Sequence, residues 1–370
     1  MAVQDFLVSK ADLGATRLRE TPRAGLGEGE ARFRVEKFAL TANNITYAAF
    51  GEAMNYWGFY PAEDGWGRIP VWGFASVIES RCSGIAADDR YYGFLPMSNE
   101  VVLRPQRLTS TRFIDGAEHR AALHEVYNSY SRCSADPFHD ARTKDAEAIL
   151  RPLFTTSWLI DDFMADNAFF GATAHGTGLV MLSSASSKTA YATAYHLARR
   201  PGIEVVGLTS PANLEFCRRL GCYHRVTTYD SLDEFDANAA CLYIDFAGNA
   251  ALRRAIHTRF TNLRYSSSIG GTHVDQLGGA RDLPGPRPVL FFAPAQIKKR
   301  SAEWGPDAFQ QRLLSAWREF VATALDSAAP WLVIEHCIGP EAVASAYVAV
   351  LSGHDDPRRG RMLSVAAGPA

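Results

Sequence analysis

Two short apolar runs, joined by a turn and a helix-like segment, constrain the fold of this chain more than any other feature. The first run is residues 179–182 (LVML) and the second is residues 203–208 (IEVVGL). Small residues at 183–187 follow the first run, and helical periodicity extends from about Lys188 to Arg199. Strand, tight turn, helix and strand in this order predict one βαβ unit. The N-terminus of such a helix presents free backbone N–H groups that can hold a phosphate.

The turn in this unit is our candidate for a dinucleotide-binding site. The usual fingerprint of such a turn is G-x-G-x-x-G, in which glycines let the backbone approach the pyrophosphate. Serine and alanine replace the glycines here, but serine is small and its hydroxyl can itself donate to a phosphate. The predicted phosphate-binding residues are Ser184, Ala185, Ser186, Ser187, Lys188 and Thr189.

Two other interpretations of the same turn stay open. Lys188 and Thr189 resemble the end of the triphosphate loop G-x-x-x-x-G-K-[ST], although Leu182 and Ser187 occupy its two glycine positions. The turn also fits a serine-rich N-cap that only starts the helix. We favour the dinucleotide interpretation over the triphosphate loop because both glycines of that loop are missing.

The rest of the chain suggests two domains with different patterns. Residues 151–295 continue to alternate strands and helices, which predicts a parallel sheet covered on both faces. Residues 1–150 contain short strands punctuated by Gly and Pro, a pattern typical of a barrel-like β domain. The tail is expected to form a helix, a strand, a helix and a strand at residues 307–327, 331–335, 340–351 and 361–365.

Composition excludes several classes of partner and compartment. The chain has 370 residues, enough for two cores, and a formal net charge of −2, so we expect no nucleic-acid partner. Six scattered cysteines without a C-x-x-C pair argue against a disulfide framework and favour reduced thiols in the cytoplasm. We expect no signal peptide, and no membrane association, because no run approaches the ~18 apolar residues of a membrane span.

This order of parts resembles the medium-chain dehydrogenase/reductase superfamily, and most closely its zinc-free, quinone-oxidoreductase-like branch. In that branch a strand ends in a turn like V-L-V-x-G-A-A-G-G-V-G, and residues 180–190 lie on it without a gap, with the glycines replaced. Residues 243–248 (YIDFAG) resemble its V-x-D-x-V-G segment, and residues 220–222 (LGC) resemble its L-G-A. The serine-rich turn suggests a divergent subgroup.

The resemblance implies an α/β chain in which a GroES-like, barrel-type domain is combined with a Rossmann domain, a doubly wound parallel sheet. The expected GroES-like catalytic and substrate domain comprises residues 1–152 and 305–370. The expected dinucleotide-binding Rossmann domain comprises residues 153–304. A homodimer is the candidate assembly.

The resemblance also bears on zinc, which other members of the superfamily hold at a G-H-E-x-x-G segment. The matching residues here are 71–76 (VWGFAS), so that Trp72 replaces the histidine and Gly73 replaces the glutamate. Without an imidazole, thiolate or carboxylate there, a catalytic zinc lacks ligands. We therefore expect no metal.

The end of the second strand indicates the type of cofactor. NAD sites place an acidic residue there, on the ribose 2′-hydroxyl. Thr209 and Ser210 stand there instead, which favours NADP(H), unless they only cap the next helix. By resemblance, further cofactor contacts are expected from the later strand ends, at Phe246, Ser268, Gly270, Gly271, Phe291 and Phe292.

Candidate catalytic residues lie in the N-terminal domain. Relatives often carry an N-P-x-D segment beneath the nicotinamide, and the matching place here holds Asn43, Thr46 and an additional Tyr47. A tyrosine hydroxyl can protonate a carbonyl oxygen or an enolate carbon after hydride transfer. Tyr56 and Tyr60 are rival donors, and all three tyrosines also fit the aromatic wall of a substrate cleft.

These expectations combine into two hypotheses. In the first, the chain is an NADP(H)-dependent, zinc-free oxidoreductase that reduces a small-molecule carbonyl, quinone or activated alkene by hydride transfer. In the second, it is a non-catalytic NADP(H)-binding sensor or scaffold. The lost glycines, and Thr46 in the place of the acid, favour the second to some degree.

Overall fold

The computed structural model describes residues 2–269, 282–353 and 355–366, and it divides into two compact units. Unit 1 is Met1–Ile149 with Leu332–Ala370, and unit 2 is Leu150–Trp331. The long helix α3 (Lys144–Asp166) begins in unit 1 and continues into unit 2. The expected boundary at residues 304/305 assigns the following helix to the N-terminal domain, whereas α8 (Pro306–Ala324) lies in unit 2.

Unit 2 contains a six-stranded parallel sheet in the order β13-β12-β11-β14-β15-β16. The strands are β11 (Gly178–Leu182), β12 (Ile203–Thr209), β13 (Arg225–Thr228), β14 (Cys241–Asp245), β15 (Leu263–Ser268) and β16 (Val289–Leu290). In chain order this is 3-2-1-4-5-6, the order of the classical Rossmann sheet. Every residue of β11 and β14 is buried, because both faces of the central strands are covered.

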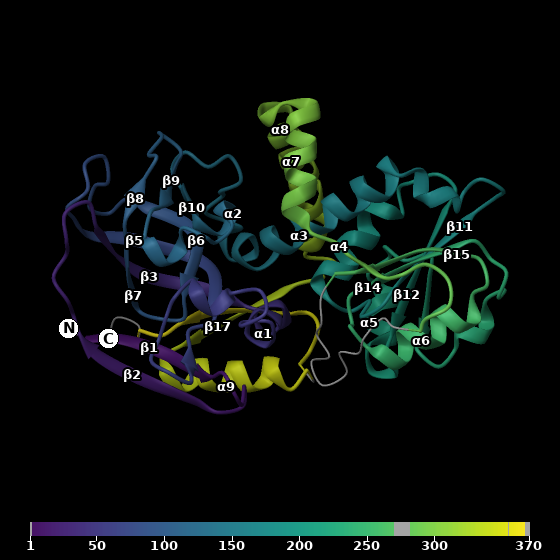
Figure 1. Ribbon diagram of the computed structural model, residues 1–370, viewed down its shortest axis with the longest axis horizontal. Coiled ribbons are helices and arrows are strands. Elements are labelled where there is room, and N and C mark those ends of the chain that lie inside the picture. The colour runs from purple at the N-terminus through teal and green to yellow at the C-terminus, as the bar shows by residue number, and fades with distance from the viewer. Residues whose placement is uncertain (1, 270–281, 354, 367–370) are drawn as a thin grey trace. The chain divides into compact units, whose positions relative to one another are not determined.

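Helices connect these strands and cover the sheet (Figure 1). They are α4 (Lys188–Leu197), α5 (Leu214–Arg219) and α6 (Ala250–Arg259), with short 3-10 turns at Ala168–Gly171, Pro211–Asn213 and Leu232–Glu234, whereas α7 (Ala293–Trp304) follows the last strand. Helix α7 was not expected, and the strand expected to reach Phe292 ends at Leu290. The reason is that Phe292 is the N-cap of α7, and Pro294 in its first turn suits a helix start.

Helix α8 packs beside α7 as a hairpin (Figure 1). Its buried residues Phe309, Leu313, Trp317 and Phe320 recur three or four positions apart, so they share one face of the helix. That face contacts α3 and α4 through ring pairs such as Phe154–Phe320 and Tyr195–Phe320. Burial of this aromatic stripe is what holds the hairpin to unit 2.

Unit 1 is built on a large, mostly antiparallel sheet in the order β17-β18-β3-β5-β6-β10-β9-β8, with β7 also paired to β3. The strands are β3 (Ala31–Leu40), β5 (Pro70–Ser80), β6 (Arg90–Pro96), β7 (Glu100–Leu103), β8 (Pro105–Gln106), β9 (Arg112–Asp115), β10 (Ser129–Arg132), β17 (Val333–Ile338) and β18 (Arg359–Ser364). The tail strands join this sheet where β18 pairs with β3. The tail was expected to return to the N-terminal domain, and β17 and β18 lie in unit 1.

A smaller sheet and several short helices complete unit 1. The sheet has the order β2-β1-β4, with β1 (Ala2–Ser9), β2 (Thr16–Pro22) and β4 (Trp66–Gly67). The helices are α1 (Ala42–Ala49), α2 (Glu125–Asn128) and α9 (Pro340–Leu351), with 3-10 turns at Tyr56–Gly58 and Glu118–Arg120. The predicted combination of a GroES-like β domain with a Rossmann domain is confirmed.

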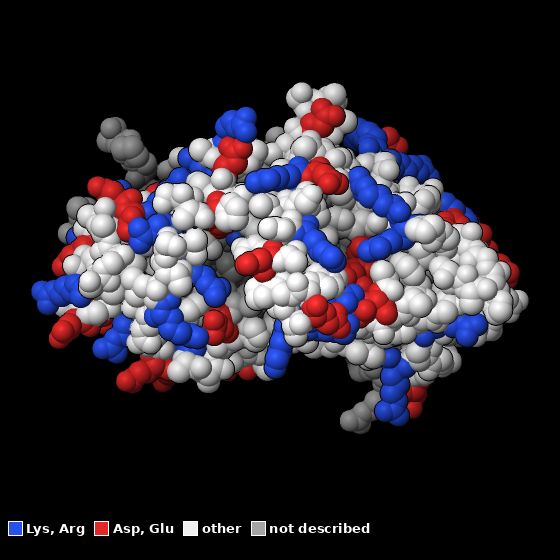
Figure 2. Space-filling view, turned by 90° about the horizontal axis from the view of Figure 1, so that it is seen from above, with Lys and Arg blue, Asp and Glu red and all other residues white. Residues whose placement is uncertain are grey.

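Two properties of the surface and helices bear on partners. Lys and Arg are interspersed with Asp and Glu on the face shown in Figure 2, in keeping with the net charge of −2. Within the described ranges, each helix is too short or too polar to cross a membrane.

Candidate functional site

The serine-rich turn after β11 keeps the backbone shape of a glycine turn. Ser184 has a φ of +48°, in the left-handed region that glycine adopts without steric cost and other residues do not. In the gap-free match to the reductase fingerprint, Ser184 takes the place of the first glycine. A non-glycine residue held there costs on the order of 1 kcal/mol, so the surrounding structure enforces this conformation.

Strand β12 fits closely against the same turn. The backbone N–H of Ala185 donates to the carbonyl oxygen of Leu208 at 3.0 Å. A Cβ atom at Gly207 would lie 2.9 Å from the Cβ of Ala185, closer than real Cβ atoms approach. Only glycine at position 207 therefore allows β12 and the turn to pack as they do.

Helix α4 begins directly at the turn and is capped by it. The Ser187 hydroxyl accepts a hydrogen bond from the backbone N–H of Ala190 at 3.3 Å. This is the capping role that the alternative interpretation assigns to the turn. Lys188 is the first residue of the helix and is half-buried, where a cation opposes the helix dipole. An anion held at the N-terminus of α4 would attract both the Lys188 ammonium and the N–H groups of the first turn.

A buried polar junction joins the ends of β11 and β14. The Ser183 hydroxyl donates to Asp245 Oδ1 at 2.9 Å and accepts from the backbone N–H groups of Phe246 and Ala247. Asp245 also pairs with Arg253 at 2.8 Å. From β11 the chain goes on to β12 on one side of the sheet, and from β14 it goes on to β15 on the other side. The two neighbouring strands therefore form a topological switch point, where open α/β sheets bind ligands. The sequence did not single out this junction, although Asp245 lies within the matched YIDFAG segment.

The end of β12 contributes the residues expected to select the cofactor. Thr209 is buried, while Ser210 is partly exposed and precedes the 3-10 turn Pro211–Asn213. The Ser210 side chain makes no capping hydrogen bond to that turn, so the capping alternative lacks support at this residue. Asn213 Nδ2 donates to Ser186 Oγ at 3.1 Å, which ties this loop to the serine-rich turn.

The remaining cofactor candidates lie at the later strand ends of unit 2. Phe246 is buried beside the Ser183 junction, and Ser268 is half-buried at the end of β15. The N–H of Phe291 donates to the carbonyl oxygen of Ser268 at 2.9 Å, and Phe292 is exposed. These residues follow neighbouring strands at one edge of the sheet. Two further candidates, Gly270 and Gly271, lie outside the described residues.

In unit 1, the residues matched to the N-P-x-D segment form a short helix, α1. Asn43 and Thr46 are half-buried on it, and Tyr47 is buried. Thr41 is its N-cap, and the neighbouring Asn44 completes the capping box and donates to the Pro70 carbonyl oxygen at 3.1 Å. Helix α1 is therefore anchored to β5 independently of the candidate residues.

Tyr47 belongs to an aromatic cluster with Tyr56, Phe59, Phe94 and Tyr127. The Tyr47 and Tyr56 rings are 4.5 Å apart, and Phe94 contacts Tyr47 and Tyr127 at 5.6 and 4.9 Å between ring centroids. Burial raises the pKa of Tyr47, and the nearby Tyr127 raises it further. Burial, then Tyr47, likewise raises the pKa of Tyr56. Sequence reasoning missed Tyr127, because it lies in a segment without a recognisable motif.

Tyr60, the third candidate donor, belongs to a different network. Its hydroxyl donates to the Phe94 carbonyl oxygen, lies 2.8 Å from the Tyr130 hydroxyl, and accepts from Arg120 at 3.3 Å. Arg120 is buried and forms a salt bridge of 2.9 Å with Asp115. Burial opposes the charged form of Arg120, but Tyr130, Tyr60 and Asp115 outweigh it and raise the Arg120 pKa. The Tyr60 hydroxyl is thus committed to a buried structural network.

The place of the family's zinc ligands is filled by backbone and aromatic contacts. Trp72 stacks on Tyr92 with ring centroids 5.5 Å apart. A Cβ atom at Gly73 would lie 2.4 Å from the carbonyl oxygen of Lys37, so no side chain fits there. In the described part of the chain, no group of three or more His, Cys, Asp or Glu side chains could hold a metal ion.

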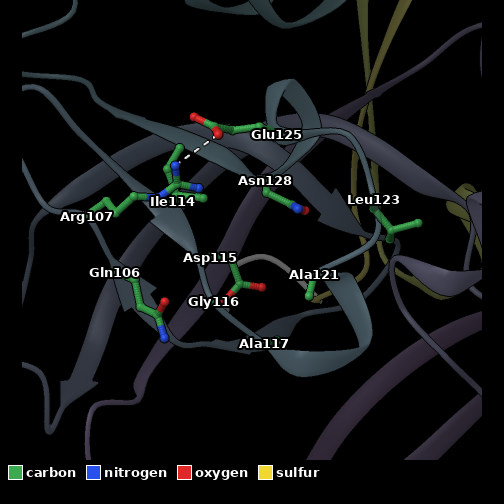
Figure 3. A pocket seen from close by; sticks show the side chains of 10 residues that line it. All are labelled: Gln106, Arg107, Ile114, Asp115, Gly116, Ala117, Ala121, Leu123, Glu125 and Asn128. Atoms are coloured by element: carbon green, nitrogen blue, oxygen red, sulfur yellow. Dashed lines mark hydrogen bonds and ion pairs between the residues drawn. The ribbon is translucent and has the colours of Figure 1, made fainter.

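A cavity of about 370 Å³ in unit 1 lies beside the Arg120 network (Figure 3). Asp115 and Asn128 line it, and the ion pair of Arg107 and Glu125, 3.0 Å long, is at its edge. Both buried polar groups already bond within the protein, since Asp115 accepts from Arg120 and Asn128 exchanges hydrogen bonds with it. The cavity walls therefore support the network and contain no candidate site residue.

Comparison with known proteins places this geometry among reductase folds. CurA from Vibrio vulnificus, solved in complex with NADPH, is 12% identical with a TM-score of 0.58, and the match covers 99% of this chain and 100% of that one. The CurK enoyl reductase is 14% identical with a TM-score of 0.53, over 98% and 99% of the two chains. The quinone oxidoreductase from Coxiella burnetii is 12% identical with a TM-score of 0.53, over 99% and 100%.

Sequence comparison complements these structural likenesses. The search of curated proteins found no match. A family model described as "Protein of unknown function (DUF2855)" matches residues 38–356. The fold that the resemblance implied is confirmed. The chain thus has the medium-chain dehydrogenase/reductase fold and belongs to the DUF2855 family.

Proposed function

We propose that this chain is an NADP(H)-dependent oxidoreductase that reduces a carbonyl, quinone or activated alkene without zinc. The observation that carries the proposal is the turn between β11 and α4, where Ser184 keeps a glycine-like backbone at the switch point of a Rossmann sheet. Three proteins of the same fold are named as reductases or bind NADPH: CurA, CurK and the Coxiella burnetii quinone oxidoreductase.

The residues present fit a bound dinucleotide phosphate. The N–H groups of the first turn of α4, the Ser184 and Ser186 hydroxyls and the Lys188 ammonium would hold the pyrophosphate. Thr209 and Ser210 stand where an acid would repel a 2′-phosphate, which favours NADP(H) over NAD(H). When bound, the reduced nicotinamide supplies the hydride.

The remaining chemical task is protonation of the reduced substrate. Tyr47 and Tyr56 are our candidate donors, because their hydroxyls are outside the Arg120 network that occupies Tyr60. Both phenols are protonated at neutral pH, as a general acid requires, and burial raises their pKa further, so a donor here needs a partner that stabilises its phenolate. The aromatic cluster around them suits a planar, conjugated substrate.

The experiment that tests this function is a fluorescence titration with NADPH and NADH, followed by NADPH oxidation with quinones, enals and enones. We expect NADPH to bind at least tenfold more tightly than NADH, roughly the effect of one charge-assisted contact, and at least one acceptor class to be reduced. Metal analysis of the purified protein should find no stoichiometric zinc. Equal affinity for both cofactors would contradict the assignment of Thr209 and Ser210.

The second candidate function is a non-catalytic NADP(H)-binding sensor or scaffold. Two substitutions favour it: serine and alanine replace the glycines of the fingerprint, and Thr46 replaces the acidic residue of the N-P-x-D segment. Tight NADPH binding without oxidation by any acceptor class would support this alternative over the reductase.

We also propose that two copies of this chain form a homodimer through β16. This strand lies at one end of the sheet, and Val289, Leu290 and Phe292 expose 48%, 60% and 43% of their surface. An exposed apolar strand at a sheet edge favours pairing with another chain. Light scattering during size-exclusion chromatography measures the mass of the particle.

We further infer a cytoplasmic location from the six unpaired cysteines.

A further inference from the structure

A third tyrosine, Tyr127, lies beside the two candidate proton donors. Its ring contacts Tyr56 and Phe59 with centroids 6.1 and 5.5 Å apart. Burial, and then the nearby Tyr56, raise the pKa of Tyr127, while Tyr127 acts in turn on the pKa values of Tyr56 and Tyr47. The three rings therefore belong to one cluster of unit 1, in which Tyr56 contacts both others, although they come from α1, the 3-10 turn Tyr56–Gly58 and α2.

The three tyrosines differ in their access to water. Tyr47 and Tyr56 expose only 7% and 8% of their surface, whereas Tyr127 is half-buried. A buried phenol alone is a poor acid, because its phenolate loses the solvation that water would supply. A neighbouring hydroxyl that donates to the phenolate offsets part of this penalty. Tyr127 is placed to do this for Tyr56, and its partial exposure gives its proton a path to solvent, although burial raises its own pKa as well.

Arg120 holds Tyr127 in place. Its guanidinium donates to the Tyr127 carbonyl oxygen at 3.0 Å and to Asn128 Oδ1 at 2.9 Å, and Asn128 Nδ2 donates back to the Arg120 carbonyl oxygen at 3.0 Å. Helix α2 has only four residues and is too short to be stable by itself. The position of Tyr127 therefore depends on Arg120, which Asp115 in turn anchors through a 2.9 Å ion pair.

We propose that Tyr127 is a further member of the proton-donating site and that Arg120 is the positioning residue that holds it; the inference rests on the proposed reductase function. Hydride transfer adds two electrons to the substrate, breaks a C=C or C=O π bond and leaves an enolate or alkoxide. The O–H bond of Tyr56 breaks as a C–H or O–H bond forms on the substrate. The Tyr56 phenolate then takes the Tyr127 proton, and water reprotonates Tyr127.

The first test needs neither substrate nor cofactor. A fluorinated tyrosine that ionises near neutral pH replaces Tyr56, and its absorbance is titrated with and without Tyr127→Phe. We expect loss of the Tyr127 hydroxyl to raise the probe's pKa by about one unit, a tenfold change in its acidity. The matched control is Tyr91→Phe, since the Tyr91 ring packs on Phe33 and Phe113 instead. An unchanged probe pKa in Tyr127→Phe would overturn the proposal.

The second test uses an acceptor that the wild-type protein reduces. Tyr127→Phe should lower kcat about tenfold or more and increase the solvent deuterium isotope effect, with NADPH affinity unchanged. Wild-type kcat in this variant would overturn the proposal. If the wild-type protein reduces no acceptor, the proposed function fails and the catalytic role of Tyr127 fails with it, while the titration still reports whether the two hydroxyls are in contact.

The role of Arg120 has its own variants. Arg120→Lys keeps the charge but loses the forked contacts to Tyr127 and Asn128, so its kcat and isotope effect should move towards those of Tyr127→Phe. Because Arg120 is buried in an ion pair, this variant is at risk of unfolding. Asn128→Ala leaves the Arg120–Asp115 pair intact and loosens only α2, and should reproduce the same isotope effect. Wild-type kinetics in a folded Asn128→Ala variant would refute the positioning role.

Discussion

One buried histidine should make the stability of this protein depend on pH. His196 on α4 lies against Phe154 and Tyr195, with ring centroids 5.3 and 5.2 Å away. Its Nε2 atom has no hydrogen-bond partner among the described residues. Burial, and then the nearby Arg199 and Arg200, lower the pKa of His196 to about 3. The folded protein therefore keeps this imidazole neutral where the unfolded chain protonates it.

The sign of the effect follows from the direction of the shift. Between the folded pKa of about 3 and an unfolded pKa of about 6.5, the unfolded state binds more protons, so stability rises with pH. We predict that His196 alone lowers the free energy of unfolding by about 2 kcal/mol between about pH 8 and about pH 5. Urea denaturation of wild type and His196→Gln should show this difference. The exposed His175→Gln is the control, and parallel pH profiles for wild type and His196→Gln would refute the prediction.

At the scale of elements, the junction of β11 and β14 depends on one serine. Ser183 is fully buried and bonds to Asp245 and to the backbone of the next turn. We predict that Ser183→Ala lowers the free energy of unfolding by about 1–3 kcal/mol, because buried polar groups lose their partner. Ser186→Ala in the same turn should cost about 0.5 kcal/mol or less, since Ser186 is partly exposed. Equal losses in the two variants would show that the junction contributes no specific stability.

At the scale of the whole molecule, the two units are expected to carry different steps. Lys188 belongs to unit 2, and Tyr56 and Tyr47 belong to unit 1. Lys188→Ala should weaken NADPH binding about tenfold or more, through loss of a charge-assisted contact worth ~1.5–3 kcal/mol. Tyr56→Phe should lower turnover by about 100-fold, with NADPH affinity unchanged, and Tyr47→Phe should do so only if Tyr47 is the donor instead.

Fluorescence titration and steady-state kinetics separate these two effects. Lys298→Ala, an exposed lysine on α7, is the control for Lys188, and Tyr91→Phe is the control for Tyr56 and Tyr47. Normal NADPH binding by Lys188→Ala would show that the serine-rich turn only caps α4. Full activity of Tyr47→Phe would make Tyr47 part of the pocket wall and leave Tyr56 as the donor.

Local patterns in the sequence were sufficient to predict most of the secondary structure. The apolar runs that became β11 and β12 predicted the βαβ unit, and α9 (Pro340–Leu351) was predicted to the residue. Such elements follow from periodicity and from capping residues, which act between near neighbours in the chain. Helix α7 escaped prediction because its apolar residues are few and a strand-like pair, Val289 and Leu290, precedes it.

The sequence by itself determined the fold class, the place of the serine-rich turn and the absence of zinc-ligating residue types at positions 71–76, because each depends on residue type at a known spacing. Only the tertiary structure decided which polar groups meet. Ser183 is 62 positions from Asp245, and Tyr60 is 60 positions from Arg120. Tyr127 likewise contacts Tyr56, which contacts Tyr47, although the three tyrosines come from separate segments of the sequence. Contacts of this range are set by packing of the sheets rather than by local propensity, and no short motif encodes them.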